Sequence, residues 1–238
     1  MSVVAASLPS LEQRERLFFL LMAVAIAVTV VSAFSLWLAA GISSFTSPWL
    51  VHVHAVSFMA WIALYVAQNT LVFRNDVARH RRLGRVGIGL GIWMVVVGLV
   101  LTPWTLAAHR SPPFFTPAYF LAMDWINIVV FGGLLAAALR LRRQTDWHRR
   151  LMLSATICVM APACGRLLIL TLDGFTTASL VGSQLAILAV AVVADLAIRG
   201  RVHNAYLWGA AALAGMGLAI EGLARLGPFE SLAAQIAG

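Results

Sequence analysis

The sequence predicts an all-α integral membrane protein: a bundle of seven transmembrane helices with a cytoplasmic N-terminus and an external C-terminus. Of its 238 residues, 61% are hydrophobic and only 11% are charged, with a mean hydropathy of +0.91. Soluble domains do not have such a composition. Long apolar stretches recur seven times along the chain, and arginines gather in alternate connections between them. Both patterns are typical of a multi-pass membrane bundle.

Each apolar stretch has about 20 residues or more, the length that a helix needs to cross the hydrocarbon core. We expect the first to be a helix rather than a signal peptide, because its apolar run is long and acids mix with arginines between Glu12 and Arg16 just before it. One transmembrane domain therefore fills residues 1–238, with spans near 17–41, 50–73, 85–108, 118–140, 150–172, 177–198 and 204–226.

The arginines predict the orientation, because short loops rich in arginine stay on the cytoplasmic side. Only Arg110 and Arg225 fall in the opposite set of connections. We therefore expect a bacterial inner membrane protein whose basic cytoplasmic loops contact anionic lipid headgroups. The cytoplasmic set comprises Arg14, Arg16, Arg74, Arg79, Arg81, Arg82, Arg85, Arg140, Arg142, Arg143, Arg149, Arg150, Arg199 and Arg201.

The composition also excludes several classes of protein. All 17 basic side chains are arginines, so the chain has no lysine for a retinal Schiff base or for a P-loop. The arginines follow the loops of a membrane protein, so we expect no nucleic-acid partner. Cys158 and Cys164 share one span, which predicts neither a disulfide framework nor a CxxC motif. An HExxH zinc motif is absent from the sequence.

Two basic segments resemble each other through the tetrapeptide His-Arg-Arg-Leu, which begins at His80 and again at His148, 68 residues later. A duplicated helix hairpin and a chance likeness of two basic loops both remain open. Together with His54, Gln68, Gly84, Met152 and Arg166, these motifs resemble those of a family of uncharacterised, predicted bacterial multi-pass membrane proteins with paired His-Arg loop motifs. The resemblance implies the topology and singles out these positions, but it implies no activity.

Charged residues within a span are functional candidates because their insertion costs about 2.5–3.5 kcal/mol each. Asp124 precedes Arg140 by 16 residues, and Arg166 follows Arg150 by 16 residues, so both lie about 24 Å from the cytoplasmic boundary. Because the fourth and fifth spans are joined by a short loop, we expect an ion pair between Asp124 and Arg166. It either locks two helices or belongs to a ligand site.

Several polar residues reach the same outer level and predict one cavity there. Pro162 leaves the carbonyl of Cys158 without its helical donor and predicts a kink beside Arg166. An irregular backbone next to an intramembrane charge is typical of a binding site. The expected wall residues are Asn127, Gln184 and Glu221, with the stripe of His54, Trp61, Tyr65 and Gln68 on the second span. Glu221 has a second interpretation, in which it extends to the outer interface.

Other polar or small residues have simpler structural interpretations. Asp195 and Arg199 are four residues apart near the inner boundary, which favours a local surface pair. Gly87 and Gly91 have the spacing that permits close helix packing in membranes.

The histidines provide the candidates for cofactor ligands, since imidazole binds haem iron axially. His54 lies on the outer side, and His80 with His148 on the inner side. The leading hypothesis is a redox-type membrane protein that binds b-type haem or a quinone at these residues. The alternatives are a small-solute transporter or receptor-like bundle with the cavity around Asp124 and Arg166, and a membrane assembly subunit. No catalytic nucleophile and base can be assigned, so the sequence leaves enzyme status open.

Overall fold

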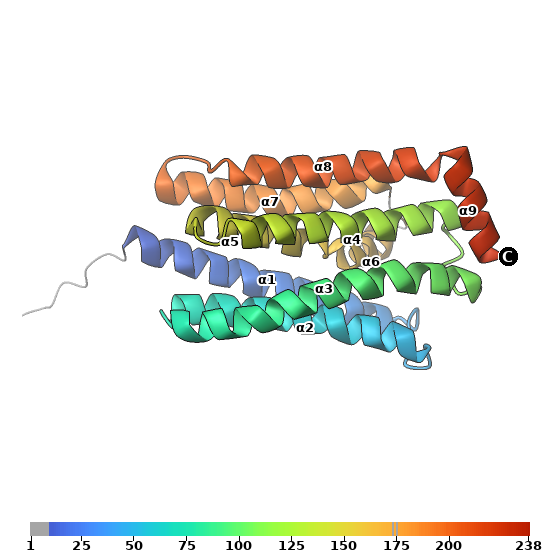
Figure 1. The fold of residues 1–238 in the computed structure, drawn as a ribbon, viewed down its shortest axis with the longest axis horizontal. Coiled ribbons are helices and arrows are strands. Elements are labelled where there is room, and N and C mark those ends of the chain that lie inside the picture. The colour runs from blue at the N-terminus through green and yellow to red at the C-terminus, as the bar shows by residue number, and fades with distance from the viewer. Residues whose placement is uncertain (1–9, 173, 175) are drawn as a thin grey trace, which may run out of the picture.

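The computed structural model describes residues 10–172, 174 and 176–238, and every regular element within them is an α-helix. Figure 1 shows the long helices side by side, with the last short helix turned across one end of the bundle. The helices are α1 (Leu11–Ala39), α2 (Trp49–Phe73), α3 (Val77–Ala107), α4 (Pro117–Arg140), α5 (Thr145–Cys158), α6 (Ala161–Leu172), α7 (Thr177–Arg199), α8 (Ala205–Ala224) and α9 (Gly227–Ala237).

The predicted all-α membrane class is confirmed. In the described ranges, six helices are long and apolar enough to cross a bilayer, and a seventh span is completed if α5 and α6 count together. Two details differ from the prediction. The span expected over 150–172 is two helices, and α3 begins at Val77 rather than near residue 85, so the arginines after His80 lie on a helix. In addition, the structure contains α9, a helix that was not predicted from the sequence.

Polar caps mark where several helices begin. Ser10 and Gln13 form a reciprocal capping box at α1, and Asp76 and Thr116 accept backbone hydrogen bonds at the starts of α3 and α4. Such caps satisfy N–H groups that have no partner within the helix. At the other end of a span, Gly200 closes α7 in the left-handed conformation, with φ of 70°, which glycine adopts without a steric penalty.

The bundle has two chemically different ends. One end, at the left in Figure 1, holds the starts of α1, α3, α5 and α8 and is here called the arginine-rich end. The opposite end holds α9 and the connections from α1 to α2, α3 to α4 and α6 to α7. The assignment of the arginine-rich end to the cytoplasm stays a prediction from the arginine distribution.

The outer surface of the spans is apolar, as contact with lipid requires. Leu21 and Val28 on α1, Ile92 on α3 and Val193 on α7 are each more than half exposed. A soluble protein seldom exposes such continuous apolar surface, whereas a bilayer solvates it.

Helix α4 lies at the centre and packs against α3, α5, α8 and α9. Glycines permit the closest approaches: a Cβ added at Gly91 would collide with Leu135 of α4, and one at Gly98 would lie 2.9 Å from Ile128. The predicted close packing at Gly87 and Gly91 is confirmed, since a Cβ at Gly87 would lie 3.1 Å from Leu64.

Helix α9 covers the opposite end of the bundle. It packs against α3 and α4 and buries Phe229 and Ala233 in a small core with Leu106 and Leu121. The indole of Trp125 meets the Phe229 ring edge-on at 6.3 Å. The helix has only 11 residues, so it rests across the ends of the spans instead of forming an eighth span.

Candidate functional site

The break between α5 and α6 confirms the predicted effect of Pro162. Helix α5 ends at Cys158, α6 begins at Ala161, and the two axes differ by 47°. Proline has no N–H group, so the carbonyl of Cys158 receives no bond from it. That carbonyl instead accepts hydrogen bonds from Asn127 Nδ2 at 3.0 Å and Gln184 Nε2 at 2.9 Å.

Asn127 and Gln184 therefore support the helix break instead of bordering the expected cavity beside Asp124. Gln184 is completely buried and also donates to the carbonyl of Ile157 at 2.9 Å. Its Oε1 atom has no partner. Side chains from two helices, α4 and α7, thus replace the backbone donor that the proline lacks.

A second proline is accommodated in the same manner. Pro103 lies inside α3, where it leaves the carbonyl of Leu99 without a helical donor. Trp125 Nε1 of α4 donates to that carbonyl at 3.1 Å. One turn further along α3, the hydroxyl of Thr102 donates to Asp124 Oδ2 at 2.9 Å. Two consecutive residues of α4, Asp124 and Trp125, therefore both bind α3 next to its proline.

The expected ion pair between Asp124 and Arg166 is absent: the structure describes both side chains, and neither makes a salt bridge with the other. They are close enough to interact electrostatically. The prediction assumed that the segment carrying Arg166 packs against α4, as α5 does. Because of the bend, α6 packs mainly against α1 and α7.

Arg166 lies instead between two aromatic rings of α1. The guanidinium carbon is 4.1 Å from the centre of the Phe34 ring and 4.8 Å from that of Trp37. Its Nη1 donates to the carbonyl of Pro162, and Trp37 Nε1 donates to the carbonyl of Arg166 at 3.1 Å. The Nε atom is buried and has no partner. The cation–π contacts hold the charge in place but leave a hydrogen-bond donor unused.

His54 of α2 lies within electrostatic range of Arg166. Its imidazole stacks on Phe58 with 4.2 Å between ring centres, and its Nδ1 atom is buried without a partner. We call His54, Arg166, Phe34, Trp37 and Phe58 the His54–Arg166 site. The site combines two buried nitrogen atoms that have no partner among the described residues with three aromatic side chains.

The remaining residues of the expected stripe on α2 do not belong to this site. Trp61 and Tyr65 are buried in the main core, where Trp61 meets Phe131 edge-on at 5.0 Å. With its amide group oriented to satisfy its neighbours, Gln68 donates to His80 Nδ1 at 2.6 Å and accepts from the Gly84 N–H at 2.8 Å. The stripe divides into a core section and a section at the arginine-rich end.

His80 and His148 lie at that end and interact electrostatically. Each is the fourth residue of its helix, α3 or α5, which extends the sequence likeness to the helix register. His148 Nδ1 lies 2.8 Å from the carbonyl of Ala138, and a carbonyl only accepts, so Nδ1 carries the proton. His148 Nε2 therefore keeps its lone pair.

Glu221 does not belong to the His54–Arg166 site. It pairs with Arg225 Nη2 at 2.5 Å and accepts a hydrogen bond from Thr177, whose hydroxyl also contacts Tyr119 at 2.6 Å. The Glu221 side chain is about a third exposed, at 35%. This agrees with the interpretation that places Glu221 at the interface.

The sequence analysis missed a cluster of buried charges at the arginine-rich end. Arg199 Nη2 donates to Glu15 at 2.8 Å, and Arg150 Nε donates to Asp195 at 3.0 Å. Arg150 is fully buried, and Glu15 and Asp195 are each 2% exposed. We call the whole set the buried ionic cluster: Glu15, Asp146, Arg149, Arg150, Asp195 and Arg199.

The cluster joins α1, α5 and α7 and balances three carboxylates against three guanidinium groups. The expected local pair of Asp195 with Arg199 is wrong, because Asp195 binds Arg150 while Arg199 binds Glu15 and Asp146. The sequence contained one indication of this cluster: Asp195 is an acidic residue within an apolar span. Its distant partners are set by how α1 and α5 pack, which the i, i+4 spacing does not encode.

Two pockets lie outside the His54–Arg166 site. One, of about 540 Å³, lies between the start of α1 and the end of α2. The other, of about 660 Å³, is an apolar groove between α4, α5 and α8 that includes Trp147 and Trp208.

No protein-family model, curated protein or solved structure matches this chain. In the part of the chain that the structure describes, no group of three or more His, Cys, Asp or Glu side chains is arranged to hold a metal ion. The fold is that of a multi-pass helical membrane protein.

Proposed function

We propose that this membrane protein binds a small quinone-type ligand, an aromatic molecule with neutral carbonyl oxygens, at the His54–Arg166 site. The observation that carries the proposal is the pair of buried, unpartnered nitrogen atoms, His54 Nδ1 and Arg166 Nε. A buried donor without a partner costs about 1–3 kcal/mol. Carbonyl oxygens of a bound ligand would satisfy these groups.

The surrounding charge favours a neutral ligand. The Asp124 carboxylate attracts the Arg166 charge electrostatically while it accepts its hydrogen bond from Thr102, so it leaves the guanidinium free to bind a ligand. An anionic ligand would add an unbalanced charge inside the membrane, which is costly. A carbonyl oxygen accepts hydrogen bonds without adding charge.

The aromatic residues favour a flat ligand that partitions into lipid. Phe34, Trp37 and Phe58 lie beside the two nitrogen atoms and offer ring faces and edges for stacking. Ligand sites are usually apolar with a few placed polar groups, which is the composition of this site.

Titration of the protein in nanodiscs with a short-chain ubiquinone analogue, followed by calorimetry, tests the proposal. We expect saturable binding that weakens about tenfold or more in Arg166→Leu and in His54→Leu, because each change removes one hydrogen bond. Arg225→Leu is the matched control, since it removes a guanidinium at the same end whose partner is Glu221. Equal affinity in wild type and Arg166→Leu would contradict the proposal.

A carrier of small carboxylates is the second candidate, favoured by the broken helix beside an intramembrane arginine. Benzoate serves as its probe in the same titration. Binding of benzoate without binding of the quinone analogue would overturn the quinone assignment in favour of the carrier.

Haem binding is the other cofactor hypothesis from the histidines. His54 precedes Gln68 by 14 residues on α2, a rise of about 21 Å, and Gln68 contacts His80. One iron therefore cannot take both His54 and His80 as axial ligands. His148, with its free Nε2 lone pair, is the better haem ligand. Under the quinone proposal, we expect oxidised and dithionite-reduced protein to show no Soret band, whereas a band lost in His148→Ala would assign haem instead.

A further inference from the structure

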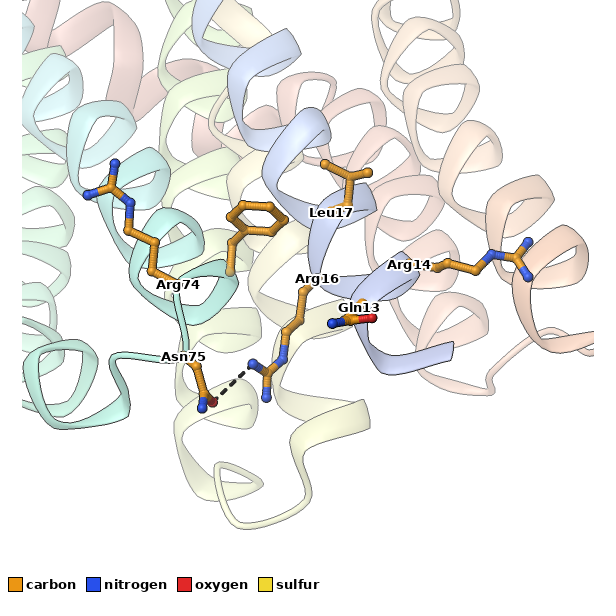
Figure 2. Close-up of a pocket in the computed structure, with 7 residues that line it drawn as sticks. Gln13, Arg14, Arg16, Leu17, Arg74 and Asn75 are labelled. Atoms are coloured by element: carbon orange, nitrogen blue, oxygen red, sulfur yellow. Dashed lines mark hydrogen bonds between the residues drawn. The ribbon is translucent and has the colours of Figure 1, made fainter. Parts of the chain in front are cut away.

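The pocket at the arginine-rich end lies where two spans meet the membrane surface. Arg14, Arg16 and Leu17 from the start of α1 face Phe73 and Arg74 at the end of α2. Figure 2 shows that both helices contribute and that the Arg16 guanidinium extends to Asn75 in the turn after α2. The position at the ends of two spans is the level of lipid headgroups.

The lining divides into a polar and an apolar part. Leu17 and Phe73 are each 44% exposed and lie on the span side, while the three arginines lie around them. Such a combination suits an amphipathic ligand, with a charged group among the arginines and a hydrocarbon chain along Leu17 and Phe73. The pocket volume of about 540 Å³ is within the range of small-ligand sites.

The charge of the pocket is strongly positive. Arg16 binds Glu12 at 2.5 Å, but Arg14 and Arg74 make no side-chain hydrogen bond or ion pair with any residue that the structure describes. In Figure 2 their guanidinium groups extend away from Arg16 on opposite sides. Both are therefore available to turn toward an anionic group.

The turn after α2 fixes one member of the pocket. Asn75 has a φ of 60°, the left-handed conformation that ends a helix, and its Oδ1 accepts from Arg16 Nη1 at 3.0 Å. Arg16 is thereby held between Glu12 and Asn75 in the wall of the pocket. A phosphate oxygen matches guanidinium donors in charge and geometry.

We propose that this pocket binds the phosphate group of an anionic phospholipid, with its acyl chain along Leu17 and Phe73. This site is separate from the His54–Arg166 site, at the other end of the bundle, and its test does not depend on the quinone.

Native mass spectrometry of protein released from nanodiscs of phosphatidylglycerol and phosphatidylcholine tests the proposal. We expect selective retention of phosphatidylglycerol and about thirty-fold weaker retention in the double variant Arg14→Gln with Arg74→Gln. Both side chains line the pocket, and the loss of two direct contacts with the phosphate, each of about 1 kcal/mol, corresponds to that change in affinity. Neither side chain has a hydrogen-bond or ion-pair partner in residues 10–172, 174 and 176–238, so the variant is expected to fold.

The matched control is Arg81→Gln with Arg82→Gln, which removes the same charge at the same end from exposed residues outside the pocket. The control is expected to retain phosphatidylglycerol as the wild type does. Equal loss in both double variants would overturn the proposal in favour of unspecific charge attraction. Binding of inorganic phosphate without a preference for phosphatidylglycerol would overturn the assignment to a lipid.

Discussion

The side-chain amide of Asn127 donates a 3.0 Å hydrogen bond to the carbonyl oxygen of Cys158, the group that Pro162 leaves without a helical donor. Gln184 donates to the same oxygen from α7. The bend that carries Arg166 away from α4 is thus stabilised by two side chains from outside the bent segment. The direction of α6, and with it the His54–Arg166 site, depends on these contacts.

The first prediction concerns these two amides. Asn127→Leu or Gln184→Leu alone is expected to lower the free energy of unfolding by about 1 kcal/mol, as interhelical hydrogen bonds in membranes typically contribute about 0.6–2 kcal/mol. The double variant is expected to lose more than the sum, because the Cys158 carbonyl then has no donor. Unfolding in mixed detergent measures the free energy of unfolding of the wild type, the two single variants and the double variant. Strict additivity would mean that the two donors act independently.

The second prediction concerns the buried ionic cluster. Arg150→Met leaves Asp195 and Glu15 buried with fewer cations, and we expect a loss of about 3–5 kcal/mol or failure to accumulate in the membrane. Arg201→Met is the control, because Arg201 is exposed and its side chain makes no hydrogen bond or ion pair with the described residues. Yield and thermal stability in detergent compare the two. A stable Arg150→Met protein would argue that the cluster contributes little.

The third prediction uses two glycines of α8. A Cβ at Gly209 would collide with the Ser154 side chain of α5, so Gly209→Ala is expected to destabilise the bundle by about 1–3 kcal/mol. Gly215 has no atom within 4 Å of the corresponding position. Gly215→Ala is therefore expected to be neutral or slightly stabilising by its helix propensity. Indistinguishable melting curves for the two variants would disprove the close contact between α5 and α8.

The fourth prediction is the orientation. Fourteen of the 17 arginines fall at the end predicted to be cytoplasmic. We expect a C-terminal alkaline phosphatase fusion to be active and a C-terminal green fluorescent protein fusion to be dark in a bacterial inner membrane. Replacing Arg142 and Arg143 with neutral residues, while placing two arginines in a loop at the opposite end, is expected to weaken the preference for an external C-terminus. Fluorescence of the C-terminal fusion with inactive phosphatase would reverse the assignment.

The membrane class, the span positions and the break at Pro162 follow from the sequence because they depend on local properties. Hydropathy over about 20 residues determines which segments cross the bilayer, and a proline removes a backbone donor wherever it stands. Gly87 and Gly91 belong to the same group, since small residues at that spacing permit close packing in any helix pair.

The partners of the charged residues were decided by tertiary structure. Asp124 and Arg166 were matched by depth alone, but the bend turns α6 toward α1, so the guanidinium meets Phe34 and Trp37 while Asp124 meets Thr102. Helical spacing likewise predicted an ion pair between Asp195 and Arg199, whereas Asp195 forms its ion pair with Arg150 of α5. Depth and periodicity fix where a side chain lies along its helix; the lateral packing of helices distant in sequence determines which group faces it.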